Sequence, residues 1–564
     1  MIRRTCLVLL LFASTAMAQS SEKYLPAKSQ IFMQIDPHEK NKAAFDKTAL
    51  GKMLLGDFGK SATALWAYAQ EAAEAAAKQQ NLPERDIALA KDGLKLVETM
   101  LVSGMALGIE LNDAFPPNGR AVVVLNKVGD GTPNVSKLLA DVLSNQDLRI
   151  NEDKVGDRAI RSFDLPGGAQ AGWWNEAGNL ILYVGTGRAV DYAKEIDAGK
   201  TGLANHATYK KLAGVADFAI GGRGFVVPSL VRVFETLHPQ LPGIADDLGL
   251  KSMSPILWVS GYDGLALRTI TEYEINGPRK GLLQFIGSKK FTLADLPAMP
   301  ADLTDFSASS FNFNSFYAGA ESVVDAVGKA FFPDQLDTVK EAIKASEGIF
   351  GLSLKDDLFA SFDDLSVSYN TSADGLFGFG STQLFKLKNE AKMKKALATI
   401  ANALPGFVEN EGGLKRRMYR GVEIFEYHAA TPGNFAVQSV AVHKGFLVFG
   451  SFPHAVQGYI MRAQDVLPSW KASEDVTKAL APFPREFTGI SVSDPRPKVR
   501  MILSSLPTLL TAGNGFHQFL PGLSVFDIDL IPHPDEATLG LFPNISVSTD
   551  DGKKIRTDSR GSFP

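Results

Sequence analysis

Cysteine is nearly absent from this sequence of 564 residues. Its one cysteine, Cys6, lies in an N-terminal stretch that we expect to be removed. The rest of the chain then has no disulfide, no cysteine-ligated zinc or iron–sulfur cluster, and no cysteine nucleophile. Disulfides are not needed for stability, because a chain of this length with 45% hydrophobic residues can bury a large core.

The sequence also lacks an excess of positive charge. The formal net charge is −4, and without Arg3 and Arg4 it becomes 56 minus 62, or −6. Proteins that bind nucleic acid neutralise phosphates with clustered lysine and arginine, so this balance argues against a nucleic-acid partner. It argues equally against simple electrostatic attachment to anionic lipid.

Long apolar runs are missing too, and the sequence predicts no transmembrane segment, since a spanning helix needs roughly 20 apolar residues. The apolar run at Leu7–Phe12 is much shorter. It follows Arg3 and Arg4 and precedes Ala16-Met17-Ala18, which is the pattern of a secretory signal peptide. We therefore expect residues 1–18 to be a Sec-type signal peptide, cleaved after Ala18, and the protein to be periplasmic or secreted.

A phosphate-binding loop is suggested by Gly59-Lys60-Ser61 but is incomplete. The G-x-x-x-x-G-K-[ST] pattern needs a glycine at position 54, where the chain has Leu54. The preceding residues 48–55 read as helix rather than strand. We interpret Gly56 and Gly59 as a helix-ending turn and Ser61 as the cap of the next helix.

Other catalytic and metal-binding motifs are absent or weak. Neither Ser260 nor Ser381 has the flanking glycines of a G-x-S-x-G nucleophile elbow. No two histidines are spaced to bind zinc from one helical face, although His428 and His443 could meet across adjacent strands. Asp356, Asp357, Asp363 and Asp364 could hold calcium, but capping by Asp356 and solvated turns explain them more simply. Asp527 and Asp529 are two apart on an expected strand and share a face, where we expect solvent-facing carboxylates rather than acid–base chemistry. We assign no catalytic, cofactor-binding or metal-binding residue, and expect no cofactor.

The two halves of the chain contain similar segments, in which a short strand ends at a glycine and leads into a helix. Four pairs of segments follow one another in the same order: 107–113 with 350–356, 156–163 with 420–425, 178–185 with 445–450, and 205–212 with 473–480. Such order favours an internal duplication over chance similarity. It predicts a first α+β repeat at 19–300 and a second at 301–564.

Both halves mix strands with separate helices. Residues 121–125, 256–275 and 306–316 read as strands. Residues 61–80 read as a helix with one apolar face, formed by Ala62, Leu65, Trp66, Ala69, Ala73 and Ala76. Ser353-Leu354-Lys355-Asp356 resembles the capping box that begins a helix. Because the strands do not alternate regularly with helices, we predict an α+β fold with largely antiparallel sheets packed against helices.

Several of these segments resemble a known family. They are the helix Phe45–Leu54, the segments Gly351–Leu358 and Gly421–Phe425, and the closing stretch Asp551–Ser562. The chain is similar to exported bacterial proteins grouped as domain-of-unknown-function family 3352, which are found as envelope proteins in planctomycete-type bacteria. The resemblance implies an envelope or secreted location and supplies neither an activity nor site residues.

Aromatic side chains are the remaining candidates for function, although such residues most often pack in a core. They gather at Trp173-Trp174 and at Phe306, Phe311, Phe313, Phe316 and Tyr317. We interpret the protein as an exported, non-enzymatic module that binds an apolar ligand in a groove, or a protein partner that could dock on helix 61–80. The alternatives are a hydrolase of an envelope ester or polymer with a dispersed active site, and a structural role in assembly.

Overall fold

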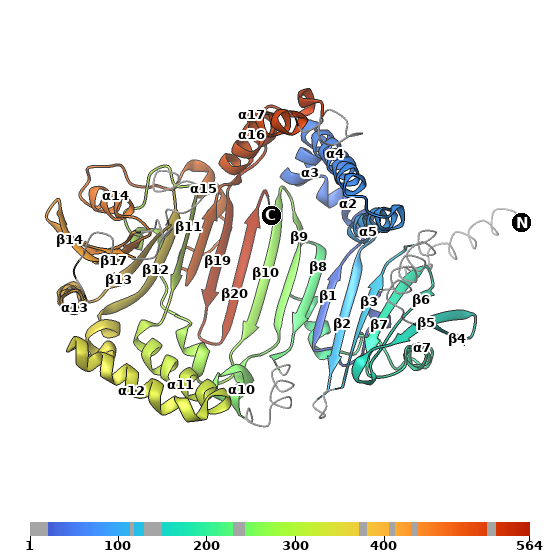
Figure 1. The fold of residues 1–564 in the computed structure, drawn as a ribbon, viewed down its shortest axis with the longest axis horizontal. Helices are drawn as coiled ribbons and strands as arrows, with labels where there is room; N and C mark the ends of the chain where they lie inside the picture. Colours follow the sequence, from blue (N-terminus) through green and yellow to red (C-terminus); the bar gives the residue numbers. More distant parts are fainter. Residues whose placement is uncertain are drawn as a thin grey trace, which may run out of the picture. The chain divides into compact units, whose positions relative to one another are not determined.

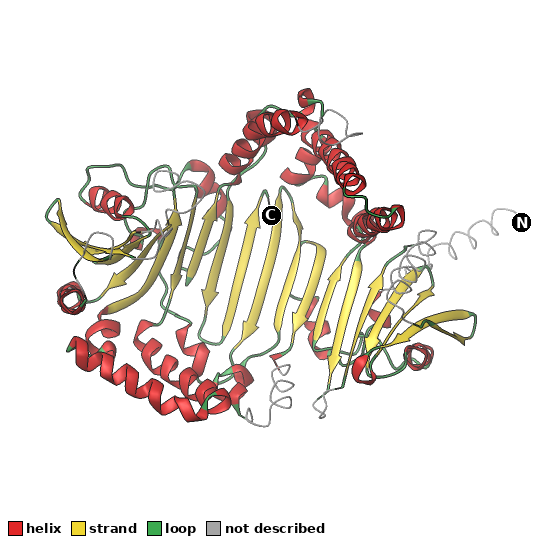
Figure 2. Cartoon of the chain, viewed as in Figure 1, coloured by secondary structure: helices red, strands yellow, loops and turns green. Residues whose placement is uncertain are grey.

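The structure is a computed structural model, and it describes residues 21–112, 118–128, 149–228, 243–371, 381–404, 406, 412–429, 437–515 and 526–563. The signal peptide predicted at residues 1–18 lies outside them. The chain forms two compact units. Unit 1 comprises residues 1–237, 255–265 and 505–532, and unit 2 comprises residues 238–254, 266–504 and 533–564. Helices and antiparallel strands make up both units, so the α+β prediction is confirmed (Figures 1 and 2).

Unit 1 contains these strands: β1 (Ile31–Ile35), β2 (Met105–Leu111), β3 (Gly119–Leu125), β4 (Asn151–Val155), β5 (Arg158–Asp164), β6 (Gln170–Glu176), β7 (Asn179–Gly185), β8 (Ala219–Val226) and β9 (Ile256–Asp263). Its helices and 3-10 turns are η1 (Ser21–Tyr24), α2 (His38–Phe45), α3 (Ala49–Leu55), α4 (Asp57–Gln79), α5 (Glu84–Ser103), η3 (Pro166–Gly168), α7 (Ala189–Asp197), α8 (Ala207–Leu212) and η13 (Ile528–Leu530).

The strands of unit 1 pair antiparallel in the order β4-β5-β6-β7-β3-β2-β1-β8-β9. Two-residue turns join several neighbours, and Ala177-Gly178 between β6 and β7 has positive φ at both positions, as a type I′ turn requires. Aromatic residues fill the core: Trp173 packs with Leu125 and Leu180, and Trp174 contacts Tyr192.

Unit 2 contains these strands: β10 (Ala266–Glu274), β11 (Asp305–Ser310), β12 (Phe362–Asn370), β13 (Ser381–Leu387), β14 (Gly413–Tyr419), β15 (Val422–His428), β16 (Val437–His443), β17 (Phe446–Gly450), β18 (Gly489–Ser493), β19 (Asn544–Asp550) and β20 (Lys554–Gly561). Its helices and turns are α10 (Ile244–Asp247), η5 (Leu250–Ser252), η6 (Gly281–Phe285), η7 (Leu293–Asp295), α11 (Phe313–Phe331), α12 (Pro333–Phe350), η8 (Leu354–Leu358), η9 (Phe359–Ser361), α13 (Glu390–Ala403), α14 (Pro453–Ala463), α15 (Glu474–Leu480) and α17 (Pro534–Thr538). Helix α16 (Pro495–Gly515) begins in unit 2 and ends in unit 1.

The strands of unit 2 pair antiparallel in the order β14-β15-β16-β17-β13-β12-β11-β18-β19-β20-β10. Helices α11 and α12 pack against each other, and Figure 2 shows them at one end of the strands. The largest core lies on one face of the sheet, where Phe306, Ile490 and Val547 meet Val456 and Ile460 of α14.

The opposite face of the same strands carries hydroxyl side chains. A Ser/Thr-x-Ser/Thr pattern recurs along adjacent strands at Ser307 and Ser309, Ser366 and Ser368, Ser491 and Ser493, Ser546 and Ser548, Thr557 and Ser559, and Thr269 and Thr271. In one row the partners run Ser368–Ser307–Ser491–Ser546–Ser559–Thr269 across β12, β11, β18, β19, β20 and β10. Since side chains alternate along a strand, this polar face is the counterpart of the buried apolar one.

Two predicted strands have different limits. The segment 256–275 forms two strands, β9 and β10, separated by Gly264, whose φ is 62°. The strand prediction for residues 306–316 is wrong beyond Ser310. The Asn312 side chain accepts the Ser315 N–H, and helix α11 begins at Phe313. The strand predicted at 121–125 is confirmed as part of β3.

The glycine-rich segment near residue 56 is a helix–helix junction. Residues 49–55 form α3, as predicted, and Gly56 both ends α3 and precedes α4. Ser61 is not a cap: it lies inside α4 and is buried. The predicted apolar face of α4 is also wrong in part, because Trp66 is 47% exposed while Ala75 and Tyr68 face inward, Tyr68 against Phe526.

Three of the four pairs of similar segments correspond to equivalent kinds of element, namely β5 with β15, β7 with β17, and α8 with α15. The fourth pairing is wrong: residues 107–113 begin in β2, whereas 350–356 run from the end of α12 into η8, which Ser353 caps by accepting the Asp356 N–H. Within the residues that the structure describes, no helix combines the length and the apolarity needed to cross a membrane.

Candidate functional site

A cavity of about 340 Å³ lies in unit 2 between α13 and the strands β14, β15 and β16. Its apolar walls are Leu397 of α13, Phe425 of β15 and Val442 of β16, with the exposed Met418 at its rim. Polar groups enter it from a few positions only: Lys394, Arg420, Glu423, His443 and Gln464. Apolar walls with a few convergent polar groups are typical of small-molecule sites. We refer to this cavity as the α13 pocket.

The β14–β15 turn places Arg420 at the α13 pocket. Tyr419 and Val422 are paired, so Arg420 and Gly421 alone make the turn, with φ values of 49° and 79°. A left-handed conformation costs a non-glycine residue about 1 kcal/mol or more. Gln464, at the end of α14, holds this turn: its Oε1 accepts from Arg420 Nε at 3.1 Å, and its Nε2 donates to the Arg420 carbonyl at 3.2 Å.

Helix α13 is fastened to the strands by Glu390. Its Oε2 accepts the backbone N–H of Gly445, in the β16–β17 turn, at 2.9 Å, and its Oε1 binds Lys394 Nζ at 2.6 Å. Burial would raise the pKa of Glu390, but the hydrogen bonds from Lys394 and Gly445 outweigh it and hold that pKa below its ordinary value. While the Glu390 carboxylate is ionised, it therefore holds helix α13, one wall of the α13 pocket, against the β16–β17 turn.

His443 ends β16 at the α13 pocket. Its Nε2 is buried and has no hydrogen-bond partner among the described residues. Burial lowers the pKa of His443 below its ordinary value, although the nearby Glu390 opposes this effect. A neutral imidazole has one donor and one acceptor, so one hydrogen-bonding atom of this ring is unused among the described residues.

Positive side chains outnumber negative ones around the α13 pocket. The guanidinium of Arg416 lies 5.7 Å from the centre of the Phe425 ring and also bonds Asn402 of α13. Lys394 and Arg420 line the pocket together with one acid, Glu423, and Lys394 is also paired with Glu390. The site is thus locally cationic in a chain whose net charge is −4.

A second cavity, of about 250 Å³, lies in unit 1 near the ends of β3 and β7. Its principal cation, Arg120, already binds Glu110 at 3.0 Å and Glu195 at 2.6 Å. The Tyr183 hydroxyl donates to the Gly187 carbonyl. Because these polar groups satisfy one another, the cavity offers a ligand less than the α13 pocket does.

His428 and His443, which the sequence allowed to meet across adjacent strands, do not meet. His428 pairs with Val437 at one end of the β15–β16 ladder, and His443 lies at the other end, beyond the Ile424–Ala441 pair. Six residues of a strand separate such positions by roughly 20 Å. His206 and His533 act as helix caps, and His238 and His517 lie outside the described residues.

The carboxylates considered for calcium and for acid–base chemistry have local roles. Asp357 accepts the Ser353 N–H, and Asp363 binds Lys289 at 2.5 Å. Contrary to the sequence prediction, Asp527 and Asp529 do not lie on a strand: Asp527 accepts the Asp529 N–H and caps the 3-10 turn η13. Among the residues with described positions, no group of three or more histidine or acidic side chains could hold a metal.

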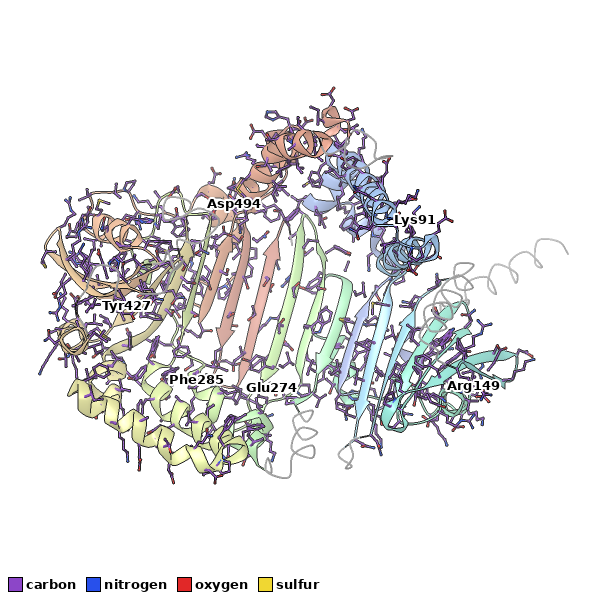
Figure 3. All side chains as sticks on the ribbon, viewed as in Figure 1. Lys91, Arg149, Glu274, Phe285, Tyr427 and Asp494 are labelled. Atoms are coloured by element: carbon purple, nitrogen blue, oxygen red, sulfur yellow. The ribbon has the colours of Figure 1, made fainter. Side chains whose placement is uncertain are left out.

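The aromatic residues singled out in the sequence pack in cores rather than lining a groove. Phe306 is buried on the β11 core face, while Phe311 and Phe313 meet at 4.6 Å and pack with Phe362 beneath α11. Phe285, labelled in Figure 3, joins this cluster through Phe316.

The sequence alone did not identify the residues of the α13 pocket as a site, because they come from separate elements. One signal could have been read: Tyr419-Arg420-Gly421-Val422 has arginine at a turn position where asparagine or glycine is usual. Figure 3 shows the neighbourhood of β15, with Tyr427 labelled.

Comparisons with known proteins give no family. No family model and no curated protein matches the chain. Two solved structures resemble part of it: crystal form III of TP0453 at 8% identity and a TM-score of 0.24, covering 47% of this chain and 84% of that one, and crystal form I of TP0453 at 5% identity and a TM-score of 0.23, covering 47% and 82%. Similarity this low supports no inference about function.

Proposed function

We propose that this chain is an exported envelope protein that binds a small apolar ligand in the α13 pocket, without catalysis. The pocket itself supports this: about 340 Å³ of space bounded by Leu397, Phe425 and Val442. Burying each methylene of a ligand there contributes about 0.8 kcal/mol. A short alkyl chain would then bind with a dissociation constant of about 1 mM or below.

Titration calorimetry with 1-octanol tests this function. The wild type should bind one equivalent, and Leu397→Trp, which fills the α13 pocket from α13, should not. The matched control is Ala391→Trp, which adds the same ring at an exposed position of the same helix and should bind as the wild type does. Equal binding by wild type and Leu397→Trp, or no binding by the wild type, would contradict the proposal.

A protein partner is the second candidate, and one observation favours it. Leu55 at the end of α3 is 63% exposed and Trp66 on α4 is 47% exposed, and exposed apolar side chains of this size can mark a protein interaction site. Photo-crosslinking from position 66 in the native cell envelope tests it. A single discrete adduct supports docking there, and reaction with solvent alone counts against it.

We further propose an internal duplication with repeats 19–300 and 301–564. Supporting it, the order β4-β5-β6-β7-β3-β2-β1-β8-β9 has a counterpart in β14-β15-β16-β17-β13-β12-β11-β18-β19, strand for strand. A crystal structure in which β1–β9 fail to superpose on β11–β19 in that order would refute it. The proposed export is tested by N-terminal sequencing of the mature protein, which should begin at Gln19.

A further inference from the structure

We infer that the ligand of the α13 pocket is an anionic amphiphile, whose acidic head lies between Arg420, Lys394 and His443 and whose apolar tail lies against Phe425 and Val442. This inference rests on the proposed function. It names the chemical class of the ligand from the arrangement of charge and apolar surface at one site. A carboxylate and a phosphate or sulfate head share the chemistry required.

The cations of the α13 pocket are placed at its mouth. Arg420 uses Nε to bind Gln464, and no described residue is recorded as bonding its two terminal nitrogens. Lys394 is 56% exposed at the side chain and holds Glu390 through one oxygen only. Both cations can therefore reach a ligand anion without leaving their present partners, since guanidinium and ammonium groups carry several N–H donors.

The apolar walls of the α13 pocket lie below these cations. Val442 and Phe425 are 4% and 9% exposed, so the apolar floor is largely buried. His443 also lines the pocket, and its buried Nε2 has no hydrogen-bond partner among the described residues. A ligand that matches both regions has an ionised head and an apolar tail of limited length.

Charge at the α13 pocket selects the sign of the head. Lys394 and Arg420 line the site and Arg416 lies over the Phe425 ring, whereas Glu423 is the acid of the lining and Glu390 is paired with Lys394. Because the whole chain is acidic, an anion has its favourable approach at such a local cationic site. The same positive side chains would repel an ammonium head.

Three ligands with one tail and different heads test the class: octanoate, 1-octanol and octylammonium, titrated by calorimetry at pH 7. We expect octanoate to bind about tenfold more tightly than 1-octanol, and octylammonium more weakly than either. The octanoate advantage should shrink in about 1 M salt, where the screening length falls to about 3 Å. Octyl sulfate in place of octanoate identifies the preferred head.

Two variants assign the effect to the cations. Lys394→Gln and Arg420→Gln should each reduce octanoate affinity severalfold and leave 1-octanol affinity unchanged. Lys395→Gln, the neighbouring exposed lysine of α13 that does not line the pocket, is the charge-matched control and should behave as wild type. Circular dichroism spectra establish that each variant is folded.

The outcomes separate the two proposals. If 1-octanol binds as tightly as octanoate, or octylammonium binds best, the anionic class is wrong while the ligand function stands. If Lys395→Gln weakens octanoate as much as Lys394→Gln does, the assignment of the head to Lys394 is wrong. If none of the three ligands binds, the proposed function itself fails.

Discussion

Arg420 and Gln464 are joined by two reciprocal hydrogen bonds, from Arg420 Nε to Gln464 Oε1 at 3.1 Å and from Gln464 Nε2 to the Arg420 carbonyl at 3.2 Å. The pair connects the β14–β15 turn to the end of α14. It therefore fixes the direction in which the guanidinium points across the α13 pocket. Without these two hydrogen bonds, the Arg420 guanidinium could point into solvent instead.

Removing this support should loosen the site more than the fold. We expect Gln464→Ala to lower the free energy of unfolding by about 1 kcal/mol, because both lost hydrogen bonds are exposed to water. Octanoate affinity should fall several-fold, because Arg420 is no longer oriented. Urea denaturation and calorimetry measure the two effects. A loss of stability without any change in octanoate binding would show that Gln464 does not position Arg420.

Arg420 should lower the stability of the fold while it strengthens octanoate binding. Its φ of 49° disfavours arginine, whereas asparagine adopts this conformation readily in a type I′ turn. Arg420→Asn should therefore raise the free energy of unfolding by about 0.5 to 1 kcal/mol while weakening octanoate binding. The control is Lys444→Asn, in the equivalent turn with φ 49°, which should stabilise similarly. A destabilised Arg420→Asn variant would contradict this description of the turn.

Acid should destabilise unit 2 through Glu390 and His443. The folded pKa of Glu390 is depressed, so its contribution is present above its unfolded pKa and is lost as pH falls through the folded value. The folded pKa of His443 is also lowered, so the unfolded chain binds more protons below about pH 6.5, and stability falls there too.

Chemical denaturation from pH 7 to pH 4 measures this dependence. His443→Gln should flatten the curve between about pH 6.5 and 5, and Glu390→Gln should flatten its more acidic part. His533→Gln is the control, since this histidine lies exposed on α17 outside the α13 pocket. If His443→Gln leaves the curve unchanged, its imidazole is not held neutral by burial.

The hydroxyl face of unit 2 predicts opposite effects for adjacent residues. Ser307 is exposed and its neighbour Ala308 is 2% exposed on the core face. Ser307→Val should be neutral or stabilise by up to about 1 kcal/mol, because valine favours strands. Ala308→Val should destabilise by about 1 to 3 kcal/mol through overpacking. Thermal unfolding measures both, and a reversed order would mean that the faces are assigned wrongly.

The fold class and many elements could be predicted from the sequence because they depend on local patterns. A short run of apolar, β-branched residues identifies strands such as residues 121–125, and the Ser-x-Ser pairs on β11, β12, β18 and β19 could have identified one open sheet face. The boundary at Phe311–Phe313 could not be read, because aromatic residues suit strands and Asn312 capping decides for helix. The exposed side of α4 depended on tertiary packing against Phe526, far away in the chain.

The α13 pocket could not be predicted for a related reason. Its polar residues come from separate elements: Lys394 from helix α13, Arg420 from the β14–β15 turn, His443 from the end of β16, and Gln464 from the end of α14. The antiparallel order of β14, β15 and β16 brings them together. Each residue alone looks like an ordinary surface group. Whether His428 could meet His443 depended on the register of the β15–β16 ladder, which places the two at opposite ends.

Native mass spectrometry of the mature protein, purified gently from its own cell envelope, tests the central claim most directly. Wild type should carry a reproducible extra mass that organic extraction removes, and Leu397→Trp prepared identically should lack it, while Ala391→Trp retains it. Wild type without any added mass, or the same added mass on Leu397→Trp, would contradict a ligand in the α13 pocket.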